Sequence, residues 1–240
     1  MTKPEGTPSP PPREPARAEP KIVLGSRSPR RLELMQLIVP GERIVVVPPR
    51  SNAEPGFDGL ASRAAIEARL AEIARAKSED MLDQIHGGTA GISLADVAAV
   101  VTADTVIIAA DSESRPVVLG QPPDDAAWAD TVRRWFHEFL LGRTHVAATA
   151  VCVRTAAGAI HERIVTTDVT FHAESPELVE WYLATGEPRG KAGGYALQAT
   201  GSVFVSRVEG SLSNVVGLPI RELLDMLEAA GVRLPRHEAA

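Results

Sequence analysis

A short run of hydroxyl and basic side chains near the start of the chain could bind a phosphate chain. This run, Ser26-Arg27-Ser28-Pro29-Arg30-Arg31, follows the apolar residues Ile22-Val23-Leu24 and Gly25 and opens an amphipathic run. The order predicts a strand, a tight turn and a helix that begins at Pro29, with Ser28 as its N-cap. The free N–H groups of a helix N-terminus attract anions, and the serines and arginines add donors for phosphate oxygens. An ordinary solvated helix start has similar residues, but two arginines at the positive end of a helix dipole favour a bound anion.

Asp104 is the candidate acid–base residue. It stands between Ala103 and Thr105, after the apolar, β-branched run 97–102, which is typical of a strand buried on both faces. We expect Asp104 at the end of that strand, where open α/β sheets bind ligands. An aspartate in such a place is often a helix cap or a turn residue, but the next run, 106–110, has a strand pattern. A carboxylate beside a phosphate chain can hold Mg²⁺ or accept a proton from attacking water, and both roles suit hydrolysis of a phosphoanhydride.

Two lysines and a glutamine complete the candidate set. Lys77 closes a long predicted helix, where a cation is ordinary. Lys191 lies in the glycine-rich segment 186–195, whose flexible backbone lets a lysine approach a phosphate closely. Gln198 follows this segment, and its amide offers a donor beside an acceptor. That pattern matches a nucleobase edge on which an N–H lies next to a carbonyl.

The elements that must position these residues alternate between strands and helices. Strands are predicted over 22–24, 44–47, 97–102, 106–110 paired with 117–119, 144–153, 160–171 and 204–208. Helices are predicted from Pro29 onward and over about 60–77, 122–141, 176–186 and 219–230. The segment 78–95 reads as a mobile surface insert because of its glycines. The predicted fold is α/β, with a mixed twisted sheet flanked by helices.

Composition excludes several classes of protein. The chain has 240 residues, of which 44% are hydrophobic and 23% charged, enough to bury one large domain or two lobes over 21–240. Residues 1–20 are rich in proline and charge and are predicted to be a disordered tail. No apolar run is long enough for a membrane span or a signal peptide, so we expect a cytoplasmic protein without a membrane partner. The net charge of −6 argues against nucleic-acid binding, and the single Cys152 excludes an internal disulfide.

Several different short motifs lie at intervals between Ile22 and Ile220. They are Ser26 to Arg31, Ala103-Asp104-Thr105, Gly142-Arg143-Thr144-His145, Thr167-Asp168-Val169-Thr170-Phe171, Lys191-Ala192-Gly193 with Gln198, and Glu209-Gly210-Ser211 leading into Asn214-Val215-Val216-Gly217-Leu218-Pro219. Together they resemble the Maf nucleotide pyrophosphatases, whose fold is related to that of the inosine triphosphate pyrophosphatases. The resemblance implies a two-lobed architecture with a substrate cleft, and members of the family commonly form homodimers.

The resemblance also implies an activity and a set of residues for it. The reaction is metal-dependent hydrolysis of a nucleoside triphosphate to the monophosphate and pyrophosphate, which would clean the nucleotide pool. Asp104 would be the proton acceptor, and Asp104 with Glu54 would hold Mg²⁺ or Mn²⁺. Ser26, Arg30, Arg31, Lys77 and Lys191 would bind the phosphates. Arg30, Thr105 and Gln198 match the specificity positions of the branch that acts on dTTP and UTP, so uracil or thymine, including modified pyrimidines, is the implied base.

Two positions depart from the family pattern. Gln121 stands where the family usually has a lysine before a proline, and Gly190 stands where it has an aspartate before the loop lysine. These departures leave open an alternative function, a non-catalytic nucleotide-binding regulator of septum formation or cell division. The intact Asp104 favours the enzyme.

Overall fold

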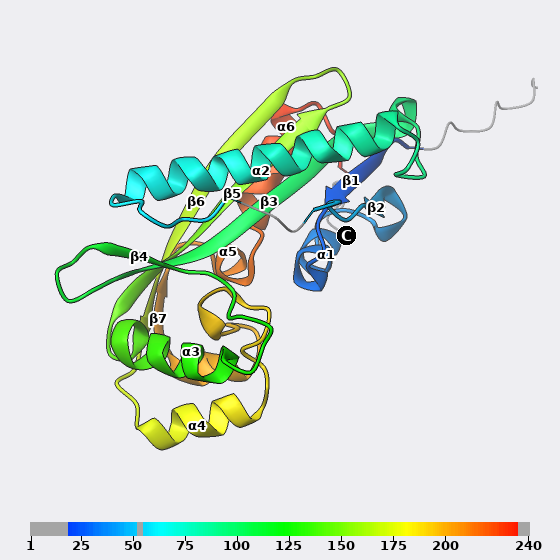
Figure 1. The fold of residues 1–240 in the computed structure, drawn as a ribbon. Helices are drawn as coiled ribbons and strands as arrows, with labels where there is room; N and C mark the ends of the chain where they lie inside the picture. The colour runs from blue at the N-terminus through cyan, green and yellow to red at the C-terminus, as the bar shows by residue number, and fades with distance from the viewer. Residues whose placement is uncertain (1–18, 52–54, 235–240) are drawn as a thin grey trace, which may run out of the picture.

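A seven-stranded mixed sheet forms the centre of the computed structural model, which describes residues 19–51 and 55–234 (Figure 1). The strands are β1 (Lys21–Gly25), β2 (Ile44–Val46), β3 (Val97–Ala110), β4 (Pro116–Leu119), β5 (Thr144–Thr155), β6 (Ile160–Phe171) and β7 (Val205–Glu209). The helices are α1 (Pro29–Gln36), α2 (Arg63–His86), α3 (Trp128–Trp135), α4 (Pro176–Ala184), α5 (Leu212–Val216) and α6 (Ile220–Ala229). The strand order is β2-β1-β3-β5-β6-β7, and β4 pairs with β3. The predicted α/β class is confirmed.

The 14-residue strand β3 lies in the middle of the sheet and pairs with three other strands. One edge pairs antiparallel with β5 from Ala99 to Ile108. The other edge has two partners in turn: β1 pairs in parallel with β3 as far as Thr102, and β4 pairs antiparallel from Ile107 onward. The four residues 103–106 lie between these two registers. Their backbone edge therefore faces the space between β1 and β4.

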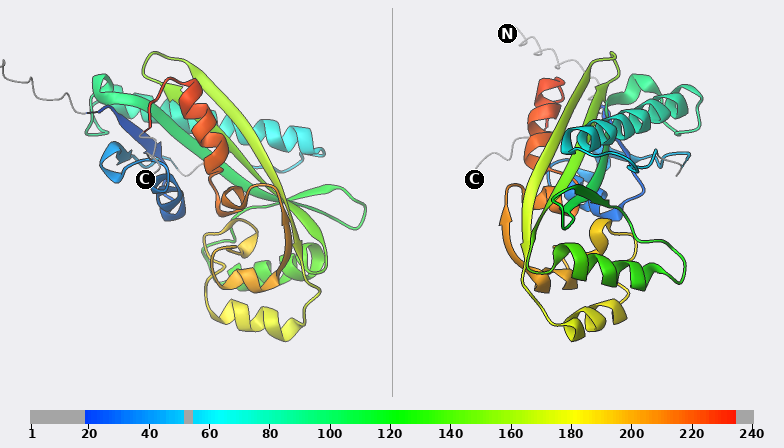
Figure 2. Two further views of the ribbon diagram at one scale, coloured as in Figure 1. Left: turned by 180° about the vertical axis from the view of Figure 1, so that it is seen from behind. Right: turned by 60° about the vertical axis from the view of Figure 1, so that its left-hand side comes forward.

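The two faces of β3 meet different helices. Val106 and Ile108 point to one face and pack with Ile66, Leu70 and Ala74 of α2. On the opposite face, Ala99, Val101 and Ala103 join a core with residues of α1 and α6. Further along the same face, Ile107 and Ala109 join a second core with residues of α3 and α4. Figure 2 shows α2 and α6 on opposite sides of the sheet, with α3 and α4 in a second lobe.

Thr105 marks the junction of the two lobes. It projects to the same face as Ala103 and Ile107, because side chains alternate along a strand. Ala103 belongs to the core of the first lobe and Ile107 to the core of the second. The polar residue between them, half-buried, lies where one apolar core gives way to the other.

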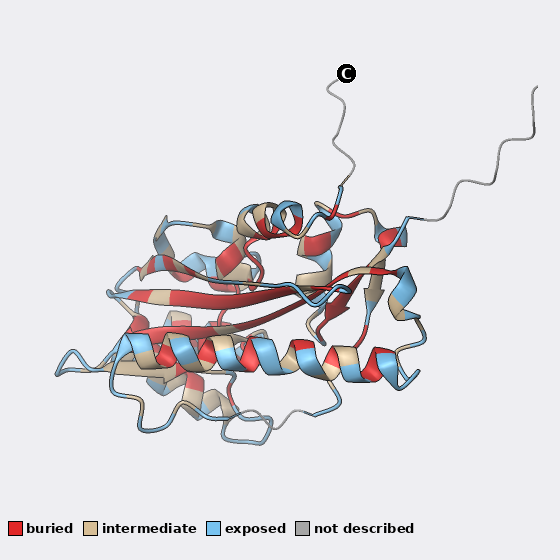
Figure 3. Ribbon diagram, turned by 90° about the horizontal axis from the view of Figure 1, so that it is seen from above, coloured by how far each residue is buried: buried red, intermediate tan, exposed pale blue. Residues whose placement is uncertain are grey.

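Two predicted elements were wrong in extent. Helix α2 does not end at Lys77 but continues to His86, through the first half of the segment predicted to be mobile. The physical reason is that Met81 and Ile85 are buried against the sheet, together with Val23 and Val100. Figure 3 shows buried residues recurring along α2 on the side toward the sheet. Similarly, 97–110 is one continuous strand, not two.

Smaller differences occur elsewhere. The helix predicted over 122–141 begins only at Trp128 and finishes in a π-helical turn, Phe136–Leu140. Helix α5 was not predicted. The other strands and helices appear within a few residues of their expected bounds. No described helix is long and apolar enough to cross a membrane.

Arg43 fastens the two ends of the described chain together. It is 6% exposed, and its guanidinium donates to the carbonyl of Pro20 and, at 2.7 Å, to the carbonyl of Arg233. It also pairs with Glu19 at 3.0 Å. The last two residues of the predicted tail therefore contact the domain, while residues 1–18 lie outside the described residues.

Candidate active site

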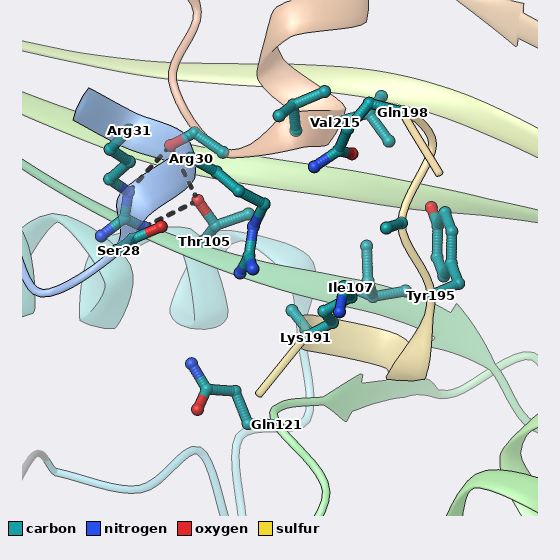
Figure 4. Close-up of a pocket in the computed structure, with 14 residues that line it drawn as sticks. Ser28, Arg30, Arg31, Thr105, Ile107, Gln121, Lys191, Tyr195, Gln198 and Val215 are labelled. Atoms are coloured by element: carbon teal, nitrogen blue, oxygen red, sulfur yellow. Dashed lines mark hydrogen bonds between the residues drawn. The ribbon is translucent and has the colours of Figure 1, made fainter. Parts of the chain in front are cut away.

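A pocket lies at the junction of the two lobes (Figure 4). Its polar lining comes from α1, β3, the segment after β4 and the loop between α4 and β7, and comprises Ser28, Arg30, Arg31, Thr105, Gln121, Lys191 and Gln198. Apolar side chains, Ile107, Tyr195 and Val215 among them, complete the wall. Five of the predicted substrate-binding residues thus meet in one pocket, namely Arg30, Arg31, Thr105, Lys191 and Gln198.

Two cations from distant parts of the chain lie close together in this pocket. Arg30 donates to the carbonyl of Gly190 at 3.2 Å, which places it next to Lys191, and Lys191 donates to the carbonyl of Glu187. Burial lowers the pKa of Arg30 below its usual value. Burial, followed by repulsion from Arg30, also lowers the pKa of Lys191. Both shifts mean that the positive charges are less stable here than in water, so a bound anion would stabilise both.

Arg31 is held differently from Arg30. Its Nε donates to the carbonyl of Gly217 at 2.9 Å, and a terminal nitrogen donates to Oγ1 of Thr105 at 3.1 Å. Thr105 in turn is hydrogen-bonded to Thr149 of β5 at 3.0 Å. Arg31 therefore joins α1 to the segment after α5, and it fixes the orientation of the Thr105 side chain.

Asp104 and Lys77 form an ion pair on the other face of β3. The Lys77 Nζ atom lies 2.6 Å from Oδ1 of Asp104, and Asp104 is only 9% exposed. Neither residue lines the pocket. Asp104 also does not stand at a strand end as predicted, because the apolar run 106–110 continues the same strand and stays paired with β5. Instead it lies within the four-residue interval 103–106, directly beside Thr105.

Ser26, a predicted substrate-binding residue, does not line the pocket. It is 4% exposed, and its Oγ accepts the N–H of Ser28 at 3.1 Å. This bond shapes the turn between β1 and α1. Ser28 is the N-cap residue, as predicted, but its side chain makes no capping hydrogen bond and instead lines the pocket.

Sequence reasoning missed a buried pair behind the pocket wall. Tyr195 lines the pocket, and its hydroxyl is hydrogen-bonded to Nε2 of His145 at 2.9 Å. Burial lowers the pKa of His145 to about 3. Phe171 packs edge-on against both rings. Tyr195 stands in the glycine-rich segment and His145 in a motif already noted, but nothing in their spacing indicates that they meet.

The chain matches the family model described as Maf-like protein over residues 21–230. It belongs to the Maf family. A dTTP/UTP pyrophosphatase of Anaeromyxobacter sp. (strain Fw109-5) is 38% identical over 220 residues, covering 90% of this chain and 92% of the relative. A dTTP/UTP pyrophosphatase of Moorella thermoacetica is 37% identical and covers 88% of this chain and 96% of the relative.

A solved structure gives a more distant match. A nucleoside-triphosphatase / dITP/XTP pyrophosphatase from Mycobacterium abscessus covers 88% of this chain and 94% of its own, with a TM-score of 0.39 and 15% identity. A similarity at this level does not bear on the site.

One departure of this Maf chain, Gln121, lines the pocket, and the other, Gly190, directly precedes the lining residue Lys191. Gln121 is exposed, in the segment whose Gly120 carbonyl accepts the N–H of Gly193 at 2.9 Å. Gly190 has φ of +66°, a left-handed conformation that favours glycine, and its carbonyl accepts from Arg30. A neutral amide and a backbone carbonyl thus stand where the Maf pattern has charged side chains.

The residues present fit a divalent cation in one particular way. Among the described residues, no three His, Cys, Asp or Glu side chains converge on a common point. Lys77 donates to Oδ1 of Asp104, and no hydrogen bond between described residues involves Oδ2. Mg²⁺ is commonly held by one or two carboxylates together with substrate phosphates, so Asp104 can serve as a ligand when a nucleotide is bound. The second predicted ligand, Glu54, lies outside the described residues.

Proposed function

We propose that this protein hydrolyses nucleoside triphosphates, dTTP and UTP above all, to the monophosphate and pyrophosphate, and so clears the nucleotide pool. The observation that carries the proposal is the meeting of Arg30 and Lys191, two half-buried cations whose pKa values are both lowered, in one pocket with Thr105 and Gln198. A polyanion with a polar, planar end group satisfies both parts of this pocket. The names of the Maf relatives, dTTP/UTP pyrophosphatase, point to the same class of substrate.

Gln198 is the residue best suited to read the base. Its side chain makes no hydrogen bond within the described part of the chain, and in Figure 4 its amide is directed into the pocket. The amide can donate to a carbonyl of uracil or thymine and accept from N3–H. Cytosine presents the opposite pattern, an acceptor at N3 and a donor at C4. Gln198 is exposed in the open pocket, and once a bound base covers its amide an unmatched polar pair costs roughly 1–3 kcal/mol.

Asp104 is the group that would activate water. Because the edge of β3 is open over 103–106, a phosphate chain that leaves the pocket beside Thr105 can reach Asp104 on the opposite face. Lys77 cancels the charge of Asp104, so the carboxylate can lie near phosphates without strong repulsion. The Asp104 carboxylate would accept the proton of a water whose oxygen bonds to the α-phosphorus, while the bond from this phosphorus to the bridging oxygen breaks and pyrophosphate leaves.

Arg30 and Lys191 would bind the phosphates before this step and would neutralise the negative charge that develops during it. Arg30 and Lys191 can exchange their backbone carbonyl partners for phosphate oxygens, which are charged and bind more strongly. A divalent cation, Mg²⁺ or Mn²⁺, held by Asp104 and Glu54, would neutralise phosphate charge and polarise the phosphoryl group. A homodimer and a cytoplasmic location stay predictions. The regulator of cell division is not favoured, because the described residues offer candidates for phosphate binding, base recognition and proton acceptance. Only Glu54, the second predicted metal ligand, lies outside the described residues.

The test is a substrate panel. Purified protein is incubated with UTP, dTTP, CTP, GTP and ATP in the presence of Mg²⁺, Mn²⁺ or a chelator, and pyrophosphate is measured. We expect release from UTP and dTTP to exceed release from CTP by about 10- to 100-fold and to stop with the chelator. Tight nucleotide binding with no pyrophosphate under any condition would contradict the proposal and support the regulator.

A further inference from the structure

The loop between α4 and β7 carries five lining residues of the pocket and is closed at its base by one carboxylate. Lys191, Tyr195 and Gln198 all lie between Glu187 and Gly201, a segment that we call the pocket loop. The N–H of Gly201, 14 residues from Glu187, donates to Oε1 of Glu187 at 2.9 Å. The N–H of Thr200 donates to Oε2, also at 2.9 Å. The two ends of the loop are thereby joined by a pair of hydrogen bonds to one charged group.

The closure point has no spare room. The hydroxyl of Tyr182, in α4, donates to Oε1 of Glu187 at 3.1 Å. A Cβ atom on the buried Gly201 would come within 2.8 Å of this hydroxyl and within 2.9 Å of the backbone nitrogen of Ala196. Only a residue without a side chain therefore allows the end of the loop to approach Tyr182 and Glu187 this closely.

The charge of Glu187 is stabilised by the same contacts. Burial by itself would raise the pKa of Glu187, but the hydrogen bonds from Gly201, Thr200 and Tyr182 outweigh it and hold the pKa below its ordinary value. The carboxylate is therefore ionised at neutral pH, and hydrogen bonds to an ionised acceptor are stronger than those between neutral groups. Glu187 itself does not line the pocket.

We propose that Glu187 is a positioning residue, whose carboxylate holds the pocket loop closed and so places Lys191 and Gln198 for nucleotide binding. Compact loops whose ends lie close together depend on such internal contacts for a single conformation. The identity of the nucleotide rests on the proposed function, whereas the closure does not. The two can therefore be tested separately.

Proteolysis tests the closure without any substrate. Arg189 and Lys191 are cleavage sites for trypsin within the pocket loop, and cleavage there requires the loop to open. The full chain is compared with Glu187→Ala, Glu187→Gln and Gly201→Ala, and with the control Glu138→Gln, which changes an exposed glutamate of the same lobe. Cleavage after Arg189 and Lys191 is followed by mass spectrometry at a temperature at which circular dichroism shows every variant folded.

We expect Glu187→Ala and Gly201→Ala to be cleaved in the loop about tenfold faster than the unchanged chain, and Glu138→Gln to behave as the unchanged chain does. Glu187→Gln keeps one acceptor oxygen and presents an NH₂ group to the other N–H, so its rate should be intermediate. Glu187 and Gly201 are the two partners of one hydrogen bond that closes the loop. Either variant can therefore show the effect if the other does not fold.

Kinetics test the positioning. We expect KM for UTP to rise about tenfold in Glu187→Ala and Gly201→Ala. The value of kcat should also fall, because the displaced Lys191 acts during the step, but by much less than the roughly 100-fold expected for loss of Asp104, since Asp104 and Lys77 lie on β3 and α2 outside the loop. Unchanged cleavage in both variants would overturn the closure. Faster cleavage with an unchanged KM would overturn the positioning. Absence of UTP hydrolysis in the unchanged chain would overturn the proposed function, and the cleavage rates would still decide the closure.

Discussion

The residues of the candidate site have two different tasks, which are proton transfer by Asp104 and nucleotide binding by the pocket residues. Asp104, on the α2 face of β3, is separated from the pocket residues by one step along the strand. We expect Asp104→Asn to lower kcat by about 100-fold or more, the usual contribution of a positioned acid or base. The protein should stay folded, because the amide keeps the shape and can still accept from Lys77. Pyrophosphate release and thermal unfolding measure the two effects, and the exposed Asp96→Asn is the control. Near-normal turnover by Asp104→Asn would exclude this residue as the proton acceptor.

Arg30 and Arg31 are adjacent but should respond differently to replacement by alanine. From sequence alone, both are expected to weaken nucleotide binding and to leave stability nearly unchanged. In the structure, this expectation fits Arg30, which makes one hydrogen bond at 3.2 Å, better than Arg31, which joins α1 to Gly217 and Thr105.

We therefore expect Arg30→Ala to weaken UTP binding by about tenfold or more with little change in Tm, since it loses charged contacts to phosphate. Arg31→Ala should also lower the free energy of unfolding, by about 1–3 kcal/mol, because it leaves partly buried acceptors without donors. Binding is measured by calorimetry and stability by urea denaturation. Equal stability of the two variants would show that the contacts of Arg31 contribute little to the fold.

Gln198→Glu tests base recognition. The substitution removes the amide donor and adds a negative charge, so kcat/KM for UTP and dTTP should fall. The ratio of kcat/KM for UTP to that for CTP should shrink from the expected 10- to 100-fold toward unity. The values for UTP, dTTP, CTP and GTP are compared in the two proteins. An equal loss for all four would show that Gln198 supports the loop and does not read the base.

At the scale of elements, the sequence predicts types better than extents. The order of strands and helices follows from apolar periodicity and from prolines such as Pro29 and Pro176, which begin α1 and α4. Thr102 is followed by Ala103, Asp104 and Thr105, which look like the end of a strand. Hydrogen bonds to β5 carry the strand through them, and such a contact between distant segments has no local signal.

For the candidate site, too, the sequence identifies residues but not the contacts between distant segments. Motifs identify Arg30, Thr105, Lys191 and Gln198, and the structure brings them into one pocket. That Asp104 and Thr105 face opposite sides of the sheet follows only from the continuity of β3. Glu187 and His145 act through partners far along the chain, Gly201 and Tyr195, so no spacing in the sequence could reveal their contacts.

Strand β5 places a histidine where it is buried in the neutral form, and this makes stability depend on pH. His145 is 1% exposed, and burial lowers its pKa to about 3, whereas an unfolded chain has an ordinary histidine pKa of about 6.5. Between these values the unfolded state binds the additional proton. Stability from this residue is therefore complete above about pH 6.5 and declines as the pH falls toward 3.

The comparison is between the unchanged chain and His145→Gln, by urea denaturation from pH 7 to pH 4. We expect the free energy of unfolding of the unchanged chain to fall more steeply, by about 1 kcal/mol per pH unit below pH 6. The exposed His137→Gln serves as the control. Parallel slopes for all three proteins would show that the pKa of His145 is the same in the folded and unfolded states.

At the scale of the whole molecule, Arg43 joins the two ends of the described chain. Replacing it by alanine would leave the carbonyls of Pro20 and Arg233 without their donor. We expect Arg43→Ala to lower the free energy of unfolding by about 2–4 kcal/mol, since the guanidinium is buried and makes several hydrogen bonds. The exposed Arg221→Ala should change it by less than about 0.5 kcal/mol. Unfolding in urea measures both, and kcat should be unaffected, because Arg43 lies away from the pocket.

The interrupted edge of β3 also bears on aggregation. An exposed strand edge is a template on which another chain can add a strand, and long, flat edges are the hazardous ones. Here the open interval is only 103–106, bounded by β1 on one side and by β4 on the other. A strand from a second molecule would collide with one of these neighbours before it could pair over more than four residues. The unpaired interval of β3 is therefore too short to serve as a template for a strand from another polypeptide.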